Sequence, residues 1–158
     1  MYYLLGTNSG NVSGLKTANM NFAIFSQLNW PAVAVAGLAY FLLGAIWYSF
    51  LFRNAWIKAA SVDVNAPDAK KGVAGVMLSS LLLMIVTSLG MALLVERTIP
   101  FGIMGAVKLG LVAGLCFSVT GISISYLYEK KPLALHLING GYHVLGCVIS
   151  AVILTLWQ

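Results

Sequence analysis

PAVAVAGLAYFLLGAIWYSFLF, residues 31–52, is the stretch that decides the fold of this chain. It holds no charged residue, and a helix of about 20 apolar residues crosses the roughly 30 Å hydrocarbon core of a bilayer. Three further apolar runs follow, at residues 72–95, 101–128 and 132–157. The runs do not alternate at every second residue, as barrel strands do. The sequence therefore predicts an all-α integral membrane protein, a bundle of about four transmembrane helices.

The composition supports the same fold class. Of the 158 residues, 60% are hydrophobic and 8% are charged, whereas soluble domains carry about 25% charged residues. The net charge is +5, but most basic residues lie at the ends of the apolar runs, where membrane proteins place cations beside anionic headgroups. They form no basic stripe interleaved with aromatic residues. We therefore expect the lipid bilayer as a partner, and no nucleic acid.

The N-terminal region differs from the rest of the chain. Residues 1–28 are predicted to form a flexible polar tail, because residues 7–19 (TNSGNVSGLKTAN) are rich in Gly, Ser and Asn. The native chain could start at Met1 or at Met20, and the sequence leaves this open. Residues 29–158 then form the transmembrane domain. The short connections after the second and third spans predict that neighbouring helices are antiparallel.

The connection after the first span has features of its own. Residues 53–60 (RNAWIKAA) are expected to form a short amphipathic segment at the membrane interface. Asn65 and Asp68 have the spacing of an N-cap and an early helical residue, so a helix is expected to start there.

Loop charges predict the orientation in the cell membrane. The first and third connections lie on one side, and they hold most of the cations: Arg53, Lys58, Lys70, Lys71, Lys130 and Lys131. The other side holds Lys16 and Arg97. Because cytoplasmic loops carry the excess of Lys and Arg, we expect the first and third connections in the cytoplasm and both termini outside. Aromatic residues near the span ends are the expected interface anchors: Trp30, Trp47, Trp56 and Trp157.

The last span contains the most informative polar residues. His136, Asn139 and His143 are spaced by three and four residues, so they share one helical face. Polar groups at bilayer depth face the bundle interior or a water-filled cavity. The histidines could be neutral and bonded to hydroxyl groups of neighbouring helices, or they could relay protons. Haem or metal ligation would need a homodimer, because no other span contains a histidine.

Two further residues complete the candidate polar site. Tyr48, near the end of the first span, is expected to line a pathway together with the polar face of the last span. Lys108 is the one cation well inside an apolar run. Its side chain could extend to the interface, as lysines do near helix ends, or it could form a site for an anion.

Small residues predict where helices touch. The third span holds a four-residue repeat of small residues, which lets backbones pack closely in lipid, within the bundle or between protomers. These residues are Ala106, Gly110, Gly114 and Ser118. In the first span, Gly37 and Gly44 share a face with Tyr40 and Tyr48. That face favours helix packing, with a groove for a lipid, quinone or pigment as the alternative. Cys116 and Cys147 are expected to be small apolar packing residues.

Particular residues resemble a known family. They are Asn29-Trp30, the segment Gly44-x-x-Trp47-Tyr48-Ser49, Trp56, the segment Asn139-Gly-Gly-Tyr142-His143, and Trp157. This pattern resembles the small bacterial and fungal membrane proteins grouped as domain-of-unknown-function family 1761, over about residues 20–158. The resemblance implies a four-helix membrane protein and no established activity.

The sequence favours a function without catalysis. The predicted spans contain no acidic residue, which argues against a conventional ion-coupled transporter and against a Ser-His-Asp arrangement. We expect no enzyme activity and no cofactor. The leading hypothesis is an accessory or scaffold protein, or a homo-oligomeric bundle, that works through helix packing with its own copies or partner membrane subunits. The alternative is a small transporter or channel with a polar pathway along the last helix. An enzyme or redox carrier has the least support.

Overall fold

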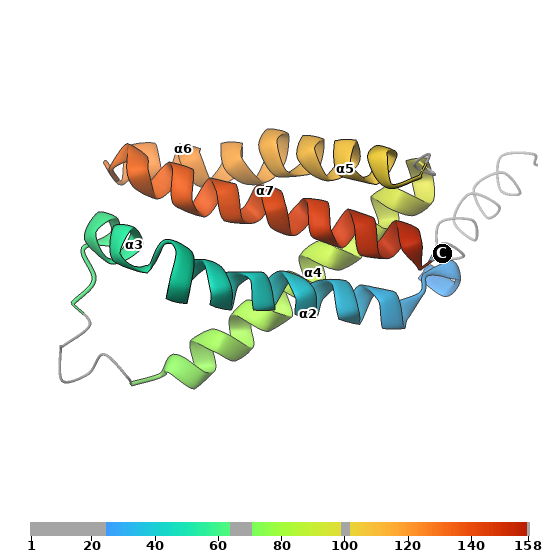
Figure 1. Ribbon diagram of the computed structural model, residues 1–158, viewed down its shortest axis with the longest axis horizontal. Coiled ribbons are helices and arrows are strands. Elements are labelled where there is room, and N and C mark those ends of the chain that lie inside the picture. Colours follow the sequence, from blue (N-terminus) through green and yellow to red (C-terminus); the bar gives the residue numbers. More distant parts are fainter. Residues whose placement is uncertain (1–24, 64–70, 99–101, 158) are drawn as a thin grey trace, which may run out of the picture.

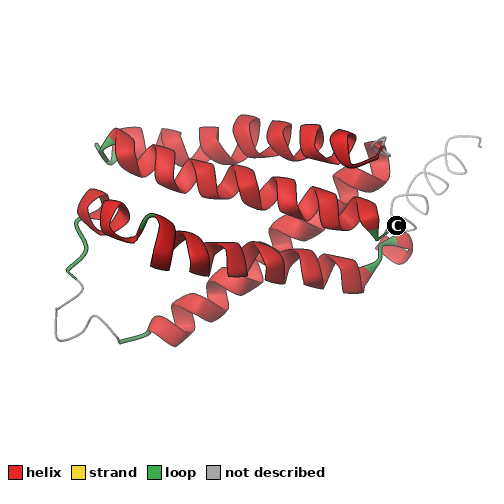
Figure 2. Ribbon diagram, in the orientation of Figure 1, coloured by secondary structure: helices red, strands yellow, loops and turns green. Residues whose placement is uncertain are grey.

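The chain is an all-α integral membrane protein. The computed structural model describes residues 25–63, 71–98 and 102–157, and in these ranges it contains helices and connections but no strand (Figures 1 and 2). Four helices are long and apolar enough to cross a membrane, at Trp30–Leu51, Val73–Thr98, Gly102–Tyr128 and Leu133–Leu156. The prediction of a bundle of about four transmembrane helices is therefore confirmed.

The spans are built from named elements. The first consists of α2 (Trp30–Ile46) and the π-helical turn η1 (Trp47–Leu51), and it is followed by the short helix α3 (Arg53–Ala60). The second is α4 (Val73–Thr98). The third consists of α5 (Gly102–Ala113), the π-helical turn η2 (Gly114–Val119) and α6 (Thr120–Tyr128). The fourth is α7 (Leu133–Leu156), and consecutive spans run in opposite directions (Figure 1).

Most helix ends lie close to those expected from sequence. Three spans begin and end within one residue of the expected positions, whereas α4 continues past the expected end at residue 95 to Thr98. Glu96 and Arg97 lie in this last turn because Glu and Arg are good helix formers, and their charges do not break the helix. Residues 1–24 of the expected tail, and the expected helix start at Asn65 and Asp68, lie outside the described residues. Leu28, at the end of that tail, is buried in the core.

The first helix starts as its sequence dictates. Asn29 is the N-cap of α2, and its side-chain Oδ1 accepts a hydrogen bond from the backbone N–H of Ala32 at 3.1 Å. Pro31 occupies the first turn, where a missing N–H leaves no bond unmade.

Two spans contain a π-helical turn, which sequence periodicity did not predict. In η1, the N–H of Phe52 donates to the carbonyl of Trp47 at 2.8 Å, five residues back. After η2, the hydroxyl of Thr120 donates to the carbonyls of Cys116 and Phe117 at 2.6 and 3.1 Å. The hydroxyl thus adds hydrogen bonds to backbone carbonyls beside the widened turn, within a segment that has no water around it.

Helix α7 is the centre of the bundle. In its most apolar stretch 44% of the residues are buried, against 22–28% in the other three spans. The third span runs antiparallel along one side of α7, and α2 and α4 pack on the other (Figure 1). The first half of α4 leans away from the bundle (Figure 1), and residues 73–79 are all exposed.

Glycines set the close helix contacts. A Cβ added to Gly110 would lie 2.5 Å from the Cα of Val148 on α7, and one added to Gly114 would lie 2.7 Å from the Cα of Val144. A Cβ on Gly37 would lie 2.8 Å from the Cα of Ile85, where α2 crosses α4. A side chain at any of these positions would push the two backbones apart, so the contacts require glycine. Close packing of this kind is what associates helices in lipid.

Candidate functional site

Asn139 joins three helices. Its side-chain Oδ1 accepts a hydrogen bond from the hydroxyl of Tyr48 on η1 at 2.8 Å. Its Nδ2 donates to the hydroxyl of Tyr126 on α6 at 2.6 Å. The acceptor oxygen and the donor nitrogen of the amide are thus both hydrogen-bonded inside the bundle, where an unpaired amide would cost free energy.

His143 lies one turn further along α7. Its Nδ1 is 2.6 Å from the hydroxyl oxygen of Tyr40 on α2, within hydrogen-bonding distance, and Tyr40 is fully buried. The ring of Tyr142 packs against His143, with centroids 4.8 Å apart. The hydroxyl of Tyr142 in turn donates to the Sδ of Met84 at 3.4 Å.

His136 and Lys108 do not join this hydrogen-bonded group. His136 meets the edge of the Tyr126 ring, with centroids 5.3 Å apart, but within the described residues it makes no hydrogen bond through its side chain. Lys108 is exposed on α5. Of the five candidate polar residues, the structure brings together Tyr48, Asn139 and His143. Tyr48 bonds to Asn139, and the ring of Tyr142 packs against the rings of both Tyr48 and His143.

The small residues expected to mediate packing on the third span lie mostly on its buried side. Ala106, Gly110 and Gly114 are buried, and Gly110 and Gly114 face α7. The hydroxyl of Ser118 lies 3.9 Å from the Sγ of the buried Cys147, whereas Cys116 is exposed. On α2, a Cβ at Gly44 would lie 3.0 Å from the hydroxyl oxygen of Tyr142.

The four tryptophans have different environments. Trp30 and Trp157 are exposed, and Trp56 is half-buried with its ring against Tyr48 at a centroid distance of 5.6 Å. Trp47 is buried and its indole N–H donates to the carbonyl of Ile138 at 3.0 Å. Trp47 therefore packs against α7. An interface anchor would instead be exposed at the surface of the bundle.

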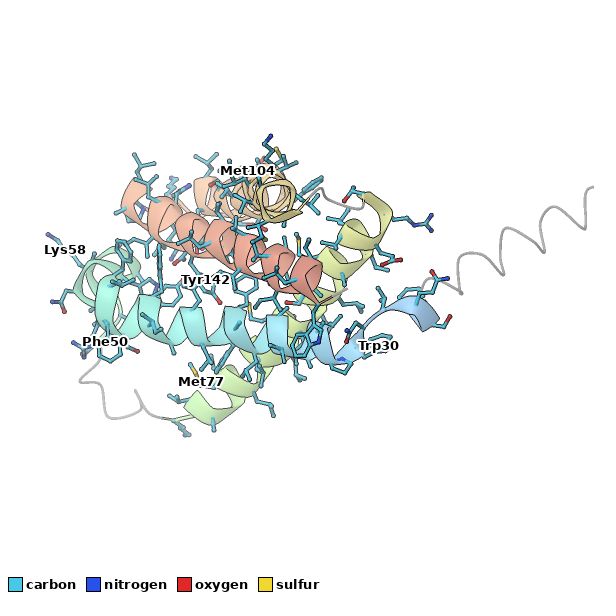
Figure 3. All side chains as sticks on the ribbon, turned by 45° about the vertical axis from the view of Figure 1, so that its right-hand side comes forward. Trp30, Phe50, Lys58, Met77, Met104 and Tyr142 are labelled. Carbon is cyan, nitrogen blue, oxygen red and sulfur yellow. The ribbon has the colours of Figure 1, made fainter. Side chains whose placement is uncertain are left out.

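A cavity opens beside His143. It has a volume of about 370 Å³ and is lined by residues of α2, η1, α4 and α7, among them Gly44, Tyr48, Ser80, Met84, Tyr142 and His143. Met77 of α4 also lines it, and Figure 3 labels Met77 and Tyr142. We call it the histidine cavity. Its lining combines hydroxyls and an imidazole with apolar surface, as in small-molecule sites.

A second cavity lies at the other end of the same helices. It has a volume of about 470 Å³, and its lining includes Asn29, Ala32, Val95, Glu96, Leu154 and Trp157. We call it the Glu96 cavity. The side-chain Nδ2 of Asn29 donates to the backbone carbonyl of Trp157 at 2.8 Å, which ties the start of α2 to the end of α7.

A packed layer separates the two cavities. The hydroxyls of Ser88 on α4 and Ser150 on α7 lie 3.2 Å apart, and both residues are fully buried. Nearby, the ring of Tyr40 lies against Gly146, and Gly37 lies against Ile85. The α2/α4/α7 seam is therefore closed between the two cavities.

Sequence reasoning missed several of these residues. Ser150, Tyr126 and Met84 carried no signal, because a single hydroxyl, phenol or thioether in an apolar run is ordinary packing material. Glu96 lies one residue beyond the apolar run that ends at residue 95, yet it belongs to the last turn of α4 and lines a cavity. In the described part of the chain, no three His, Cys, Asp or Glu side chains come close enough to hold a metal ion.

The comparisons with known proteins agree with this architecture. No curated protein and no solved structure matches the chain. The model of a family described as "Protein of unknown function (DUF1761)" matches residues 31–155, which include all of α4, α5, α6 and nearly all of α2 and α7. Since that match covers most of the sequence, the chain belongs to the DUF1761 family.

Proposed function

We propose that this protein is a small transporter whose pathway follows the α2/α4/α7 seam from the histidine cavity to the Glu96 cavity. The observation that supports this most is that the same three helices line both cavities, which lie in opposite halves of the bundle. A bundle that only held other proteins together would have no need of two cavities along one seam.

The layer between the cavities is suited to opening. Ser88 and Ser150 join α4 to α7 there through a single hydroxyl–hydroxyl contact. A neutral hydrogen bond of this kind contributes only about 0.5–1.5 kcal/mol net. The contact of α7 with α5, in contrast, brings backbones together at Gly110 and Gly114. We therefore expect α4 to move relative to α7 while α5 stays in place.

The helix contacts give the scaffold or homo-oligomer hypothesis less support than the sequence alone does. It depended on the small-residue repeat of the third span, and Gly110 and Gly114 of that repeat pack against α7 of the same chain. A surface already covered within the bundle does not offer a contact to a second copy or to a partner subunit.

We also propose an orientation in the cell membrane. Arg53 and Lys58 lie on α3, Lys71 just before α4, and Lys130 and Lys131 in the turn before α7. The antiparallel spans bring these segments to one end of the bundle (Figure 1). By the positive-inside rule this end faces the cytoplasm, so the histidine cavity opens toward the cytoplasm and the Glu96 cavity toward the outside.

Cysteine accessibility tests the pathway. In a background with Cys116 and Cys147 replaced by Ala, the near-isosteric substitution Ser150→Cys places a thiol in the closed layer. A small, charged, membrane-impermeant thiol reagent is added to either side of proteoliposomes with a known orientation. We expect labelling from each side, because a transporter exposes its central layer to both.

The matched control is Ala113→Cys. Ala113 is also buried, but it lies on α5 and outside both cavity linings. This thiol should stay unlabelled. If the cysteine at position 150 reacts from neither side, or no faster than the one at position 113, the seam does not open and the proposal fails.

A further inference from the structure

We propose that the Glu96 cavity binds an organic ammonium ion, which would make alkylammonium compounds the substrate class of the pathway. As a substrate assignment this rests on the proposed transport function. As a binding site it stands on the residues of the cavity alone.

The charge of the cavity favours a cation. Among the described residues that line it, Glu96 is the only charged one. Glu96 is half-buried, and no Lys, Arg or His within residues 25–63, 71–98 and 102–157 forms an ion pair with it. The neighbouring Arg97 is exposed and does not line the cavity. A partly desolvated carboxylate without a partner gains from an incoming positive charge.

The ends of helices add to the negative electrostatic potential of the cavity. The last turns of α4 and α7 both reach the cavity, through Glu96 and through Leu154 and Trp157. The C-terminal end of a helix carries a partial negative charge. The opposing positive end, at the start of α2, is already capped by the side chain of Asn29. The end of α7 is also capped, because Nδ2 of Asn29 donates to the carbonyl of Trp157. The negative potential at the cavity therefore comes mainly from the last turn of α4 together with Glu96.

The remaining surface selects an organic cation rather than a metal ion. Calcium takes six to eight oxygen ligands, and this cavity offers one carboxylate, that of Glu96. Its other walls include Leu28, Ala32, Val95 and Leu154, which suit alkyl groups. Trp157 at its edge supplies an indole, the side chain that attracts ammonium groups best through its ring face. The volume of about 470 Å³ is ample for a small alkylammonium ion.

Equilibrium binding tests the site. The full chain is placed in nanodiscs of phosphatidylglycerol and titrated with tetraethylammonium chloride by isothermal calorimetry. We expect saturable binding that Glu96→Gln weakens by about tenfold or more, because the Coulombic attraction between one partly buried carboxylate and the quaternary cation is lost. Trp157→Leu should weaken it as well. Glu129→Gln is the matched control, because Glu129 is exposed, pairs with Lys131 and lies outside the cavity lining.

The ammonium group could belong to a soluble compound or to a choline headgroup. Nanodiscs of phosphatidylcholine separate these sources. If the headgroup occupies the cavity, tetraethylammonium binds more weakly there than in phosphatidylglycerol, and Glu96→Gln removes this difference. If binding is equal in the two lipids, the ligand is soluble. If the Glu96→Gln variant binds tetraethylammonium as tightly as the unaltered protein, the ammonium site does not exist. The same holds if the sodium ion of sodium acetate displaces tetraethylammonium at equal ionic strength.

Uptake of tetraethylammonium into proteoliposomes separates the two proposals. Binding that depends on Glu96, with neither uptake nor labelling at position 150, would refute transport and leave the ammonium site intact. Labelling of the cysteine at position 150 from both sides without binding at Glu96 would leave the pathway intact and refute the ammonium site.

Discussion

The ring of Tyr40 lies directly against Gly146, so that a Cβ on the glycine would overlap the ring. This contact seats α2 on α7 and leaves the tyrosine fully buried. One turn earlier on the same face of α7, Nδ1 of His143 lies 2.6 Å from the Tyr40 hydroxyl oxygen. The missing side chain at Gly146 is therefore what lets Tyr40 reach the histidine.

We expect Gly146→Ala to destabilise the protein by about 1–3 kcal/mol, the usual effect of overpacking a core. The measurement is the free energy of unfolding in an SDS titration, followed by circular dichroism. Gly90→Ala is the control, because nothing lies within 4 Å of a Cβ at Gly90, and a helical Gly→Ala change alone stabilises by about 0.5–1 kcal/mol. Equal stability of the two variants would show that Tyr40 does not occupy this position.

The contact at Gly110 distinguishes packing within the chain from packing between chains. Gly110→Leu should lower the free energy of unfolding, because its Cβ would meet the backbone at Val148, while the mass of the particle in native mass spectrometry stays the same. Gly121→Leu, a site in the same span with nothing within 4 Å, should change neither quantity. A lower mass for Gly110→Leu with unaltered stability would mean that the repeat joins separate protomers.

Asn139 should couple energetically to Tyr48. Hydrogen bonds between transmembrane helices contribute about 0.6 kcal/mol on average and at most about 1.7 kcal/mol. We expect a double-mutant cycle of Asn139→Leu and Tyr48→Phe, measured by unfolding in SDS, to give a coupling energy in that range. A cycle with Tyr128→Phe serves as the reference, since Tyr128 is exposed, and its coupling to Asn139 should be zero. Zero coupling for Tyr48 as well would contradict the bond at 2.8 Å.

The Ser88–Ser150 contact should limit the opening of the seam. Replacing both serines with Ala leaves no hydroxyl unpaired and removes about 1 kcal/mol of attraction between α4 and α7. The uptake of tetraethylammonium by proteoliposomes should then rise roughly fivefold, which is the rate effect of about 1 kcal/mol. Thr87→Ala is the control, because its hydroxyl donates to the carbonyl of Leu83 in its own helix. Uptake that is unchanged or lower in the double variant would show that the contact is no barrier.

The orientation can be checked with reporter fusions. An enzyme that is active only outside the cytoplasm, fused after Gln158, should be active. The same reporter inserted between Lys130 and Lys131 should be silent, because the positive-inside rule places that turn in the cytoplasm. The reverse pattern would exchange the sides to which the histidine and Glu96 cavities open.

The sequence by itself determined the four spans and the polar face of the last one. Inside a bilayer each helix must satisfy its own backbone hydrogen bonds, so a span is a local property that a run such as residues 31–52 displays directly. The spacing of His136, Asn139 and His143 likewise fixes a shared face within one helix, whatever surrounds it. The extension of α4 to Thr98 lies beyond the apolar run, because Glu96 and Arg97 continue the helix although they are charged.

Only the tertiary structure decided which faces meet. Lipid tails are as apolar as leucine side chains, so hydrophobicity does not tell a helix surface that touches lipid from one that touches another helix. The pairing of Asn139 with Tyr126, the contact of Ser88 with Ser150 and the placing of Glu96 in a cavity all depend on how separate helices cross. These crossings are set by close packing at a few glycines. The sequence does not indicate which residue of another helix each glycine will contact.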